Sequence, residues 1–267
     1  MLKQLFGAPL LVALILSGRA RAAPAPPGLD MVVTAVTGKP LGKRGPLRLL
    51  DQLREPDLVR VPAGATLVVF QYQDALQYTL HGPGSFAARR TGLVRVSGTG
   101  TLAAERLDPA FAQLRARSSA ALVKAGVTVR SSAAGAPDSP PDDDAVDPSS
   151  VLLRWAERAH VGQYGVTLTD RADRVLYRTE LSGNAAGPAG IFALPLGSTY
   201  RWELTWHDRA GQVRMAAHRF STLTAPQLAT MARLRPAAGA PPTTRIMFGL
   251  WLLGTGASEL AEPYLAP

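Results

Sequence analysis

The residues best suited to acid–base or metal chemistry in this sequence are four histidines, at positions 81, 160, 207 and 218. No two of them stand four apart, the spacing that places two imidazoles on one helix face for a metal ion. The chain has no cysteine, which excludes a thiolate metal site, a thiol nucleophile and a disulfide framework. His207 and His218 are spaced to meet across a hairpin, without a third ligand nearby. We therefore expect no metal site and no cofactor.

Paired carboxylates are the other source of chemistry, because glycosidases use one as an acid and one as a base or nucleophile. The sequence offers two such pairs, Glu157 with Glu180 and Asp170 with Asp173, but no pattern places either pair in a cleft. The acidic triplet at 142–144 lacks the alternating ligands and the closing glutamate of a calcium loop. Serine-nucleophile and phosphate-loop motifs are also missing from the sequence. We predict that the protein is not an enzyme.

An aromatic stripe is the strongest candidate for ligand binding. Tyr200, Trp202 and Trp206 alternate with polar residues, so they share one face of a strand. This alternation is typical of a sandwich core, which we predict for Trp202. Trp206 stands near the strand end beside His207 and Arg209. We predict that Trp206, His207 and Arg209 form the site at which this part of the chain binds a glycan or a peptide.

Short strands must position most of these residues. The chain has 267 residues, 46% of them hydrophobic, with 25 glycines and 22 prolines, a composition typical of folded domains rich in turns. Period-two patterns between residues 31 and 98 predict short antiparallel strands. Asp108 and Pro109 predict the start of a helix that Gly126 ends, and a strand at 127–129 follows. Together these elements predict a β domain with one helix over residues 31–130.

A linker, a second β domain and a helical tail complete the expected organisation. Residues 131–148 contain four prolines and the acidic triplet without apolar periodicity, which predicts an acidic, proline-rich linker. Strand patterns over residues 149–224 predict an antiparallel β-sandwich. Residues 225–267 predict three short helices. The fold class is therefore mainly β: two antiparallel β domains with a short helical C-terminal tail.

The apolar run at 246–253 in the tail has two interpretations. We expect it to pack on the second β domain, because it is too apolar to face water. The alternative is a docking surface for a partner protein, formed by Phe248, Trp251 and Leu252, which predicts that the run is exposed in the isolated chain. The run is shorter than the ~20 residues that span a bilayer, so no transmembrane helix is expected after signal cleavage.

The first 22 residues have the pattern of an export signal. Lys3 precedes an apolar run at 5–16, and Ala20 and Ala22 place small residues at a cleavage site. We predict cleavage after Ala22 and a periplasmic location; the alternative is an uncleaved anchor. Cleavage lowers the formal net charge from +9 to +6. The arginines are scattered singly or in pairs, so no nucleic-acid partner is expected.

Two parts of the chain resemble known modules. Residues 33–38, 49–53, 61–65 and 78–86 carry a resemblance to a FecR-like domain, a periplasmic β module. The corner at 194–202, the strand ending in Trp155 and the closing residues 220–222 resemble a fibronectin type III or immunoglobulin-like sandwich, with Pro195 and Leu196 exchanged relative to the usual order. The resemblances imply scaffolds that bind partners, without chemistry of their own.

Taken together, these observations predict a non-catalytic periplasmic protein that uses two β domains as platforms for binding, assembly or signalling. Its partner is expected to be an envelope protein or a cell-wall glycan. One alternative is an envelope-acting hydrolase with an unrecognised site, which predicts a deep pocket with converging carboxylates or histidines. The other is a structural subunit of an envelope complex, which predicts an exposed run at 246–253.

Overall fold

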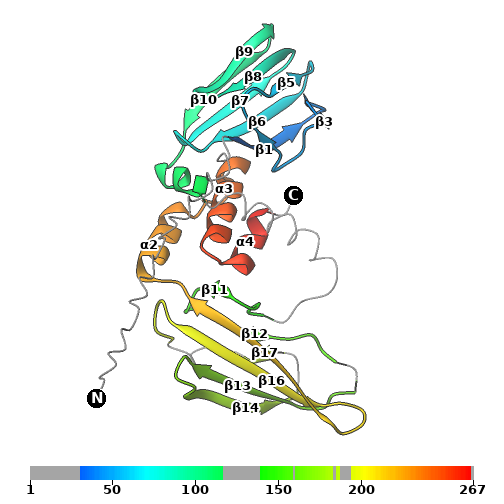
Figure 1. The fold of residues 1–267 in the computed structure, drawn as a ribbon, viewed down its shortest axis with the longest axis vertical. Helices are drawn as coiled ribbons and strands as arrows, with labels where there is room; N and C mark the ends of the chain where they lie inside the picture. Colours follow the sequence, from blue (N-terminus) through cyan, green and yellow to red (C-terminus); the bar gives the residue numbers. More distant parts are fainter. Residues whose placement is uncertain (1–30, 117–138, 159, 183–184, 187–193, 266–267) are drawn as a thin grey trace, which may run out of the picture.

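The fold is mainly β, as predicted, with antiparallel sheets and three short α-helices at the C-terminal end (Figure 1). The computed structural model describes residues 31–116, 139–158, 160–182, 185–186 and 194–265. The expected signal sequence, the end of the 108–126 helix, the strand at 127–129 and residues 131–138 of the expected linker lie outside these residues. None of the helices in the described ranges is long and apolar enough to cross a membrane.

The first β unit, residues 31–106, consists of two packed five-stranded sheets. Its strands are β1 (Met31–Thr37), β2 (Leu41–Gly42), β3 (Gly45–Pro46), β4 (Gln52–Leu53), β5 (Leu58–Val61), β6 (Thr66–Gln71), β7 (Leu76–His81), β8 (Gly84–Arg89), β9 (Gly92–Gly98) and β10 (Thr101–Arg106). One sheet has the order β10-β7-β6-β1-β4 and the other β3-β2-β5-β8-β9, with antiparallel pairing throughout.

Side-chain alternation explains how these two sheets form a core. In β5, Val59 and Val61 are buried, whereas Leu58 and Arg60 are exposed. The buried residues of both sheets, including Leu67 and Phe86, form one hydrophobic cluster. The strands predicted around residues 32–36, 66–72, 78–80 and 94–96 are confirmed as β1, β6, β7 and β9.

A 3₁₀ helix, η1 (Pro109–Ala116), follows the first β unit. It starts as predicted: the Asp108 carboxylate accepts a hydrogen bond from the N–H of Ala110 at 2.8 Å, and Pro109 occupies the first helical position. Phe111 is buried against Phe70, with ring centroids 6.4 Å apart in an edge-on contact. The helix therefore covers part of the outer face of the sheet that contains β6.

The second β unit, residues 139–222, is built on one five-stranded sheet. Its strands are β11 (Asp144–Val146), β12 (Leu153–Arg154), β13 (Tyr164–Asp170), β14 (Val175–Leu181), β15 (Ala185–Ala186), β16 (Thr199–His207) and β17 (Val213–Thr222). The main sheet has the order β11-β17-β16-β13-β14, and β12 and β15 form a separate pair. Buried side chains from both sheets, among them Trp155, Tyr164 and Trp202, form its core.

The acidic triplet lies in the second β unit and not in a linker. Asp144 is the first residue of β11, which pairs in parallel with the end of β17. The backbone of Ser139 also exchanges two hydrogen bonds with Arg154, each 2.7 Å long. A three-residue parallel strand carries no alternation that sequence reasoning can detect. In the structure, the second β unit thus already includes residue 139, ten residues before the predicted boundary.

Three α-helices follow β17: α2 (Ala225–Leu234), α3 (Pro242–Gly254) and α4 (Ser258–Leu265). α2 begins with a capping box in which the Thr224 hydroxyl accepts from the N–H of Gln227, and the Gln227 side chain accepts from the N–H of Thr224. α3 begins after Pro241 without a side-chain cap. Thr243, the second residue of α3, is buried, and its hydroxyl contacts that of Thr34 in β1 at 2.9 Å.

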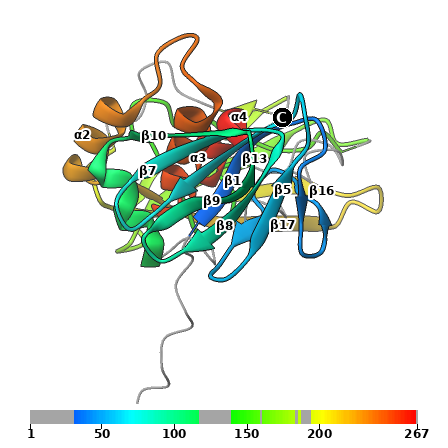
Figure 2. The ribbon, with the colours of Figure 1, turned by 90° about the horizontal axis from the view of Figure 1, so that it is seen from above.

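The helices lie between the two β units and join them (Figure 1). In the view from above, the strands of the first β unit lie in front of α3 (Figure 2). α3 contacts β1 and η1, and α4 contacts both α3 and β11. One hydrophobic cluster includes Val32 and Phe70 of the first β unit, Ala145 of the second, Leu223 directly after it, and Phe248 of α3. The expectation that the apolar run packs on the second β unit is therefore corrected: α3 packs on the first unit, and α4 reaches the second.

A buried carboxylate holds α4 against β11 of the second β unit. Asp144 in β11 is 1% exposed and accepts hydrogen bonds from the backbone N–H and the hydroxyl of Ser258, at 2.7 and 2.6 Å, and from the N–H of Glu259 at 3.2 Å. These groups form the start of α4, where the helix dipole and unpaired amides favour a negative charge. A strand of the second β unit thus caps α4, which packs on α3, the helix that contacts β1 of the first unit.

Candidate functional site

The aromatic stripe of β16 changes environment along the strand. Tyr200 and Trp202 are buried at 3% and 0% exposure, and the Trp202 indole N–H donates to the carbonyl of Pro140 at 3.3 Å. Leu204 continues the buried row, whereas Trp206, at the end of the strand, is only partly buried. Trp202 is a core residue, as predicted, and Trp206 lies at the edge of that core.

A hollow of about 440 Å³ surrounds Trp206 at this end of the second β unit. The guanidinium carbon of Arg158 lies 4.1 Å from the centroid of a Trp206 ring, which is a cation–π contact. The backbone N–H of Arg158 donates to the Tyr164 hydroxyl at 2.9 Å, which ties this segment to the core. The lining residues are Arg158, His160, Val161, Trp206, Asp208, Arg209 and Ala210; we call this hollow the Trp206 site.

A second guanidinium, that of Arg209, lines the Trp206 site. Arg209 contacts Nε2 of His160. Arg209 forms no ion pair with any carboxylate in the described ranges. His160 also has a positive φ of 73°, a backbone conformation that is uncommon outside glycine.

The carboxylate of the Trp206 site is already used by the turn that contains it. Asp208 accepts from the backbone N–H groups of Ala210 and Gln212 and pairs with Arg214, whose Nη2 lies 2.7 Å from Oδ2. The hydrogen bond from Gln212 and that from Arg214 are the main causes that hold the pKa of Asp208 below its usual value. The charge of Asp208 is thus balanced within the turn that contains it.

Two of the three predicted binding residues, Trp206 and Arg209, meet in this site, and His207 does not. His207 points to the other face of the sheet, because neighbouring residues in a strand alternate, and it pairs with Val213. Sequence reasoning missed Arg158 and His160, which lie in an irregular segment. Their position depends on the pairing of Tyr164 with Trp206, a register that the strand patterns alone do not give.

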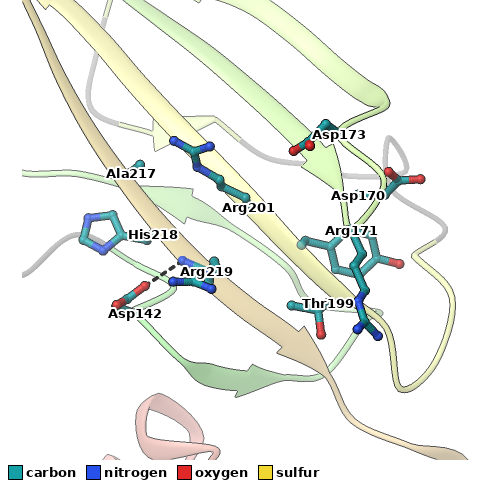
Figure 3. Close-up of a pocket in the computed structure, with 10 residues that line it drawn as sticks. Asp142, Asp170, Arg171, Asp173, Thr199, Arg201, Ala217, His218 and Arg219 are labelled. Atoms are coloured by element: carbon teal, nitrogen blue, oxygen red, sulfur yellow. Dashed lines mark hydrogen bonds between the residues drawn. The ribbon is translucent and has the colours of Figure 1, made fainter. Parts of the chain in front are cut away.

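A second hollow, of about 540 Å³, lies over β16 and β17 near the β13–β14 turn (Figure 3). Arg171, Arg201 and Arg219 line it together with Asp142, Asp170 and Asp173, so its charges balance. Asp142 accepts from the backbone N–H of Arg219 at 2.8 Å, the bond drawn as a dashed line.

Neither of the two carboxylate pairs considered from the sequence has the environment of a glycosidase site. The side-chain hydrogen bond from Arg174 is the largest cause that lowers the pKa of Asp170. A general acid needs the opposite shift. Glu157 and Glu180 are both exposed, the first in the loop after β12 and the second on β14.

The register of β16 with β17 shows whether His207 and His218 meet across the hairpin. His207 pairs with Val213, whereas His218 pairs with Trp202 and stacks on its ring at 5.1 Å between centroids. The two imidazoles therefore do not meet across the hairpin. Within the described residues, no group of three His, Asp or Glu side chains is arranged to hold a metal ion.

The three side chains assigned to a docking surface are inside the molecule. Phe248 and Leu252 are 1% exposed and Trp251 is 8% exposed. Phe248 stacks on Trp251 with centroids 6.1 Å apart and meets Tyr264 of α4 edge-on at 4.7 Å. The docking and structural-subunit hypotheses expect the run at 246–253 to be exposed. In the structure the run is buried instead, because η1, β1 and α4 cover it.

No protein-family model matches this sequence, and no curated protein matches it. Among solved structures, CopC from Methylosinus trichosporium OB3b is similar over 34% of this chain and 92% of CopC, with 17% sequence identity and a TM-score of 0.26. We draw neither a fold nor a function from a likeness at this level.

Proposed function

We propose that this protein is an exported, non-catalytic binding component of a bacterial envelope, located in the periplasm, and that its second β unit binds an acidic cell-wall glycan. The observation that carries the proposal is the Trp206 site, where Arg158 lies over the Trp206 ring and Arg209 is held by His160. Pre-positioned guanidiniums suit carboxylates, which they bind with two parallel hydrogen bonds.

The covered state of α3 supports a glycan over a protein that docks on the tail. Phe248, Trp251 and Leu252 already have partners within the chain, so they offer no surface in the folded protein. Arg158 and Arg209 line the Trp206 site, which is the alternative surface for a partner. An acidic polymer would match the charge of their guanidiniums. We infer that the helices hold the two β units together while the second unit binds.

We also propose that the first β unit is FecR-like and the second fibronectin- or immunoglobulin-like. In the first unit, the segment at 61–65 forms the turn between β5 and β6, and the segment at 78–86 spans β7, its turn and β8. In the second, the corner at 194–202 leads into β16, where Tyr200 stacks on Phe220 with centroids 5.4 Å apart. These placements agree with a scaffold role.

Co-sedimentation with purified peptidoglycan sacculi tests the glycan proposal. We expect the chain from Ala23 onward to pellet with sacculi and the double variant Arg158→Ala, Arg209→Ala to lose at least about tenfold in affinity, because two charge-assisted contacts are removed. The matched control is Arg44→Ala with Arg106→Ala, two exposed arginines of the first β unit. Absence of binding, or equal loss in both double variants, would show that the Trp206 site is not the glycan site.

A further inference from the structure

The edge strand of the second β unit carries exposed apolar and charged side chains. β14 is the outermost strand of its sheet, and no strand in the described ranges pairs with its outer side. Two apolar side chains at its start, Val175 and Leu176, are 50% and 46% exposed. An exposed edge presents unpaired backbone N–H and C=O groups to another chain. The strand is seven residues long, which is enough for a specific pairing.

We propose that β14 pairs antiparallel with β14 of a second copy of this chain, about a two-fold axis at Thr179. Arg178 and Glu180 stand two residues apart, so both point to the outer face of the sheet. In this register, Arg178 of each copy lies directly opposite Glu180 of the other. The pairing therefore forms two equivalent ion pairs and one continuous sheet across both copies.

Symmetric registers centred next to Thr179 are less favourable. An axis at Arg178 or at Glu180 would place two like charges directly opposite each other, which destabilises a strand pair. An axis between two residues would pair side chains of the core face with side chains of the outer face. The axis at Thr179 avoids both, because residues 177–181 meet partners on the same face. The charge pattern of this one strand is thus complementary to itself.

Self-complementarity is the reason to assign the surface to a second copy. A two-fold contact requires the same patch to match itself, and Arg178 and Glu180 flank Thr179 with opposite charges at equal distance. A contact of one short strand buries little area, so we expect a weak dimer.

Dimerisation would also place two Trp206 sites at a fixed spacing. This consequence rests on the proposed function, whereas the proposal of the dimer is independent of it. Trp206 pairs with Tyr164, which pairs with Leu181. From strand spacing and rise, the two Trp206 sites would stand about 28 Å apart on one face of the shared sheet. Two sites at a fixed spacing would bind a polymer with greater avidity than one.

Cysteine cross-linking tests the register without any ligand. The chain has no cysteine, so Thr179→Cys introduces its only thiol. Directly opposed Cα atoms in an antiparallel pair are about 4.5–5.5 Å apart, within the range of a disulfide. We expect oxidised Thr179→Cys to run as a covalent dimer on a non-reducing gel. The control is Thr167→Cys in β13, one strand inward and opposite Arg178, whose Cα atoms would be about 16 Å apart. Failure of Thr179→Cys to cross-link, or equal cross-linking of both variants, would overturn the proposal.

Charge reversal tests the ion pairs by sedimentation velocity over a range of protein concentrations. Arg178→Glu places Glu opposite Glu in both pairs, so we expect the dissociation constant to rise about tenfold or more. The double variant Arg178→Glu, Glu180→Arg restores opposite charges and should restore the wild-type value. Both positions are exposed, and circular dichroism checks that the variants fold. A wild-type chain that stays monomeric, an unchanged constant in Arg178→Glu, or no restoration in the double variant would each rule out this interface.

Discussion

Phe248 of α3 and Trp206 of β16 are both large aromatic side chains in segments with the features of a binding surface, yet they have opposite environments. Phe248 is 1% exposed and contacts Trp251 and Tyr264. Trp206 is partly buried at the end of a strand, where Arg158 lies over its ring and Arg209 lines the same hollow. One residue is covered by the chain itself, and the other remains at the surface among cations.

The difference comes from the path that the chain takes after each segment. After α3, Thr255 and Gly256 reverse the chain direction; Gly256 has a φ of 89°, and α4 folds back on α3. After Trp206, the chain enters a turn organised by Asp208 and returns as β17 on the same sheet. An apolar segment is thus available to a partner only where the chain provides no second layer.

The largest loss of stability is expected from a substitution in α3, the covered segment of this comparison. Phe248→Ala removes a fully buried aromatic side chain and leaves a cavity, so we expect it to lower the free energy of unfolding by about 3–5 kcal/mol. Urea unfolding followed by tryptophan fluorescence measures this. Arg245→Ala, an exposed change on the same helix, should stay within about 0.5 kcal/mol of wild type. A loss below about 1 kcal/mol for Phe248→Ala would contradict a core role.

The next largest effect is expected at the contact between Asp144 of β11 and the start of α4. Asp144→Asn removes the charge that accepts three hydrogen bonds at the start of α4 and puts donors against donors, so we expect a loss of about 2 kcal/mol. Its neighbour provides a matched control: Asp143 is exposed and has a φ of 57°, which asparagine tolerates. If Asp143→Asn destabilised the protein as much as Asp144→Asn in the same unfolding experiment, the cap would not be the cause.

A smaller effect is expected at the Trp206 site. Trp206→Ala removes a partly buried ring and one cation–π contact, and we expect it to cost about 1 kcal/mol. Trp202→Ala, four residues earlier on the same face, should cost about 3–5 kcal/mol because Trp202 is fully buried. Thermal unfolding of both variants compares them. Equal losses would mean that Trp206 is a core residue and not part of a binding surface.

The elements of this fold could be predicted from the sequence where their pattern is strong. Strand patterns over residues 149–224 predicted the antiparallel sheet that contains β13, β14, β16 and β17, and the Asp108–Pro109 signal predicted the start of η1. The parallel strand β11 escaped because three residues beside prolines carry no alternation, and its pairing is decided by contacts with β17 and α4. The place of α3 escaped for a related reason: its apolar residues predict burial but not the surface that buries them.

The candidate site could be predicted only in part. Trp206 and Arg209 belong to a strand end and the turn after it, so the strand pattern places them near each other. Arg158 and His160 come from an irregular segment more than 40 residues earlier in the chain, and only the pairing of Tyr164 with Trp206 brings them there. His207 was assigned to the site by its sequence position, but strand alternation turns it to the opposite face.

The smallest effect should come from an ion pair at the edge of the helical layer. Asp108 before η1 pairs with Arg233 of α2. Burial by itself raises the pKa of Asp108, but the hydrogen bond from Ala110 and the contact with Arg233 outweigh it, so the pKa lies below its ordinary value of 3.8. The folded protein thus holds the charged form more strongly than the unfolded chain does. The resulting stability is present above pH 3.8 and is lost as the pH falls through the folded pKa.

Asp108→Asn isolates this charge, because asparagine retains the capping oxygen for Ala110. We expect a loss of less than about 1 kcal/mol at pH 7, since both partners are partly exposed, and convergence with wild type at acid pH. Unfolding of Asp108→Asn, Arg233→Gln and the double variant over a pH series measures the coupling. Additive losses in the double variant would show that the two charges do not interact. A loss as large as that of Phe248→Ala would show that polar contacts at the edge, and not the apolar cover of α3, hold the helices against the first β unit.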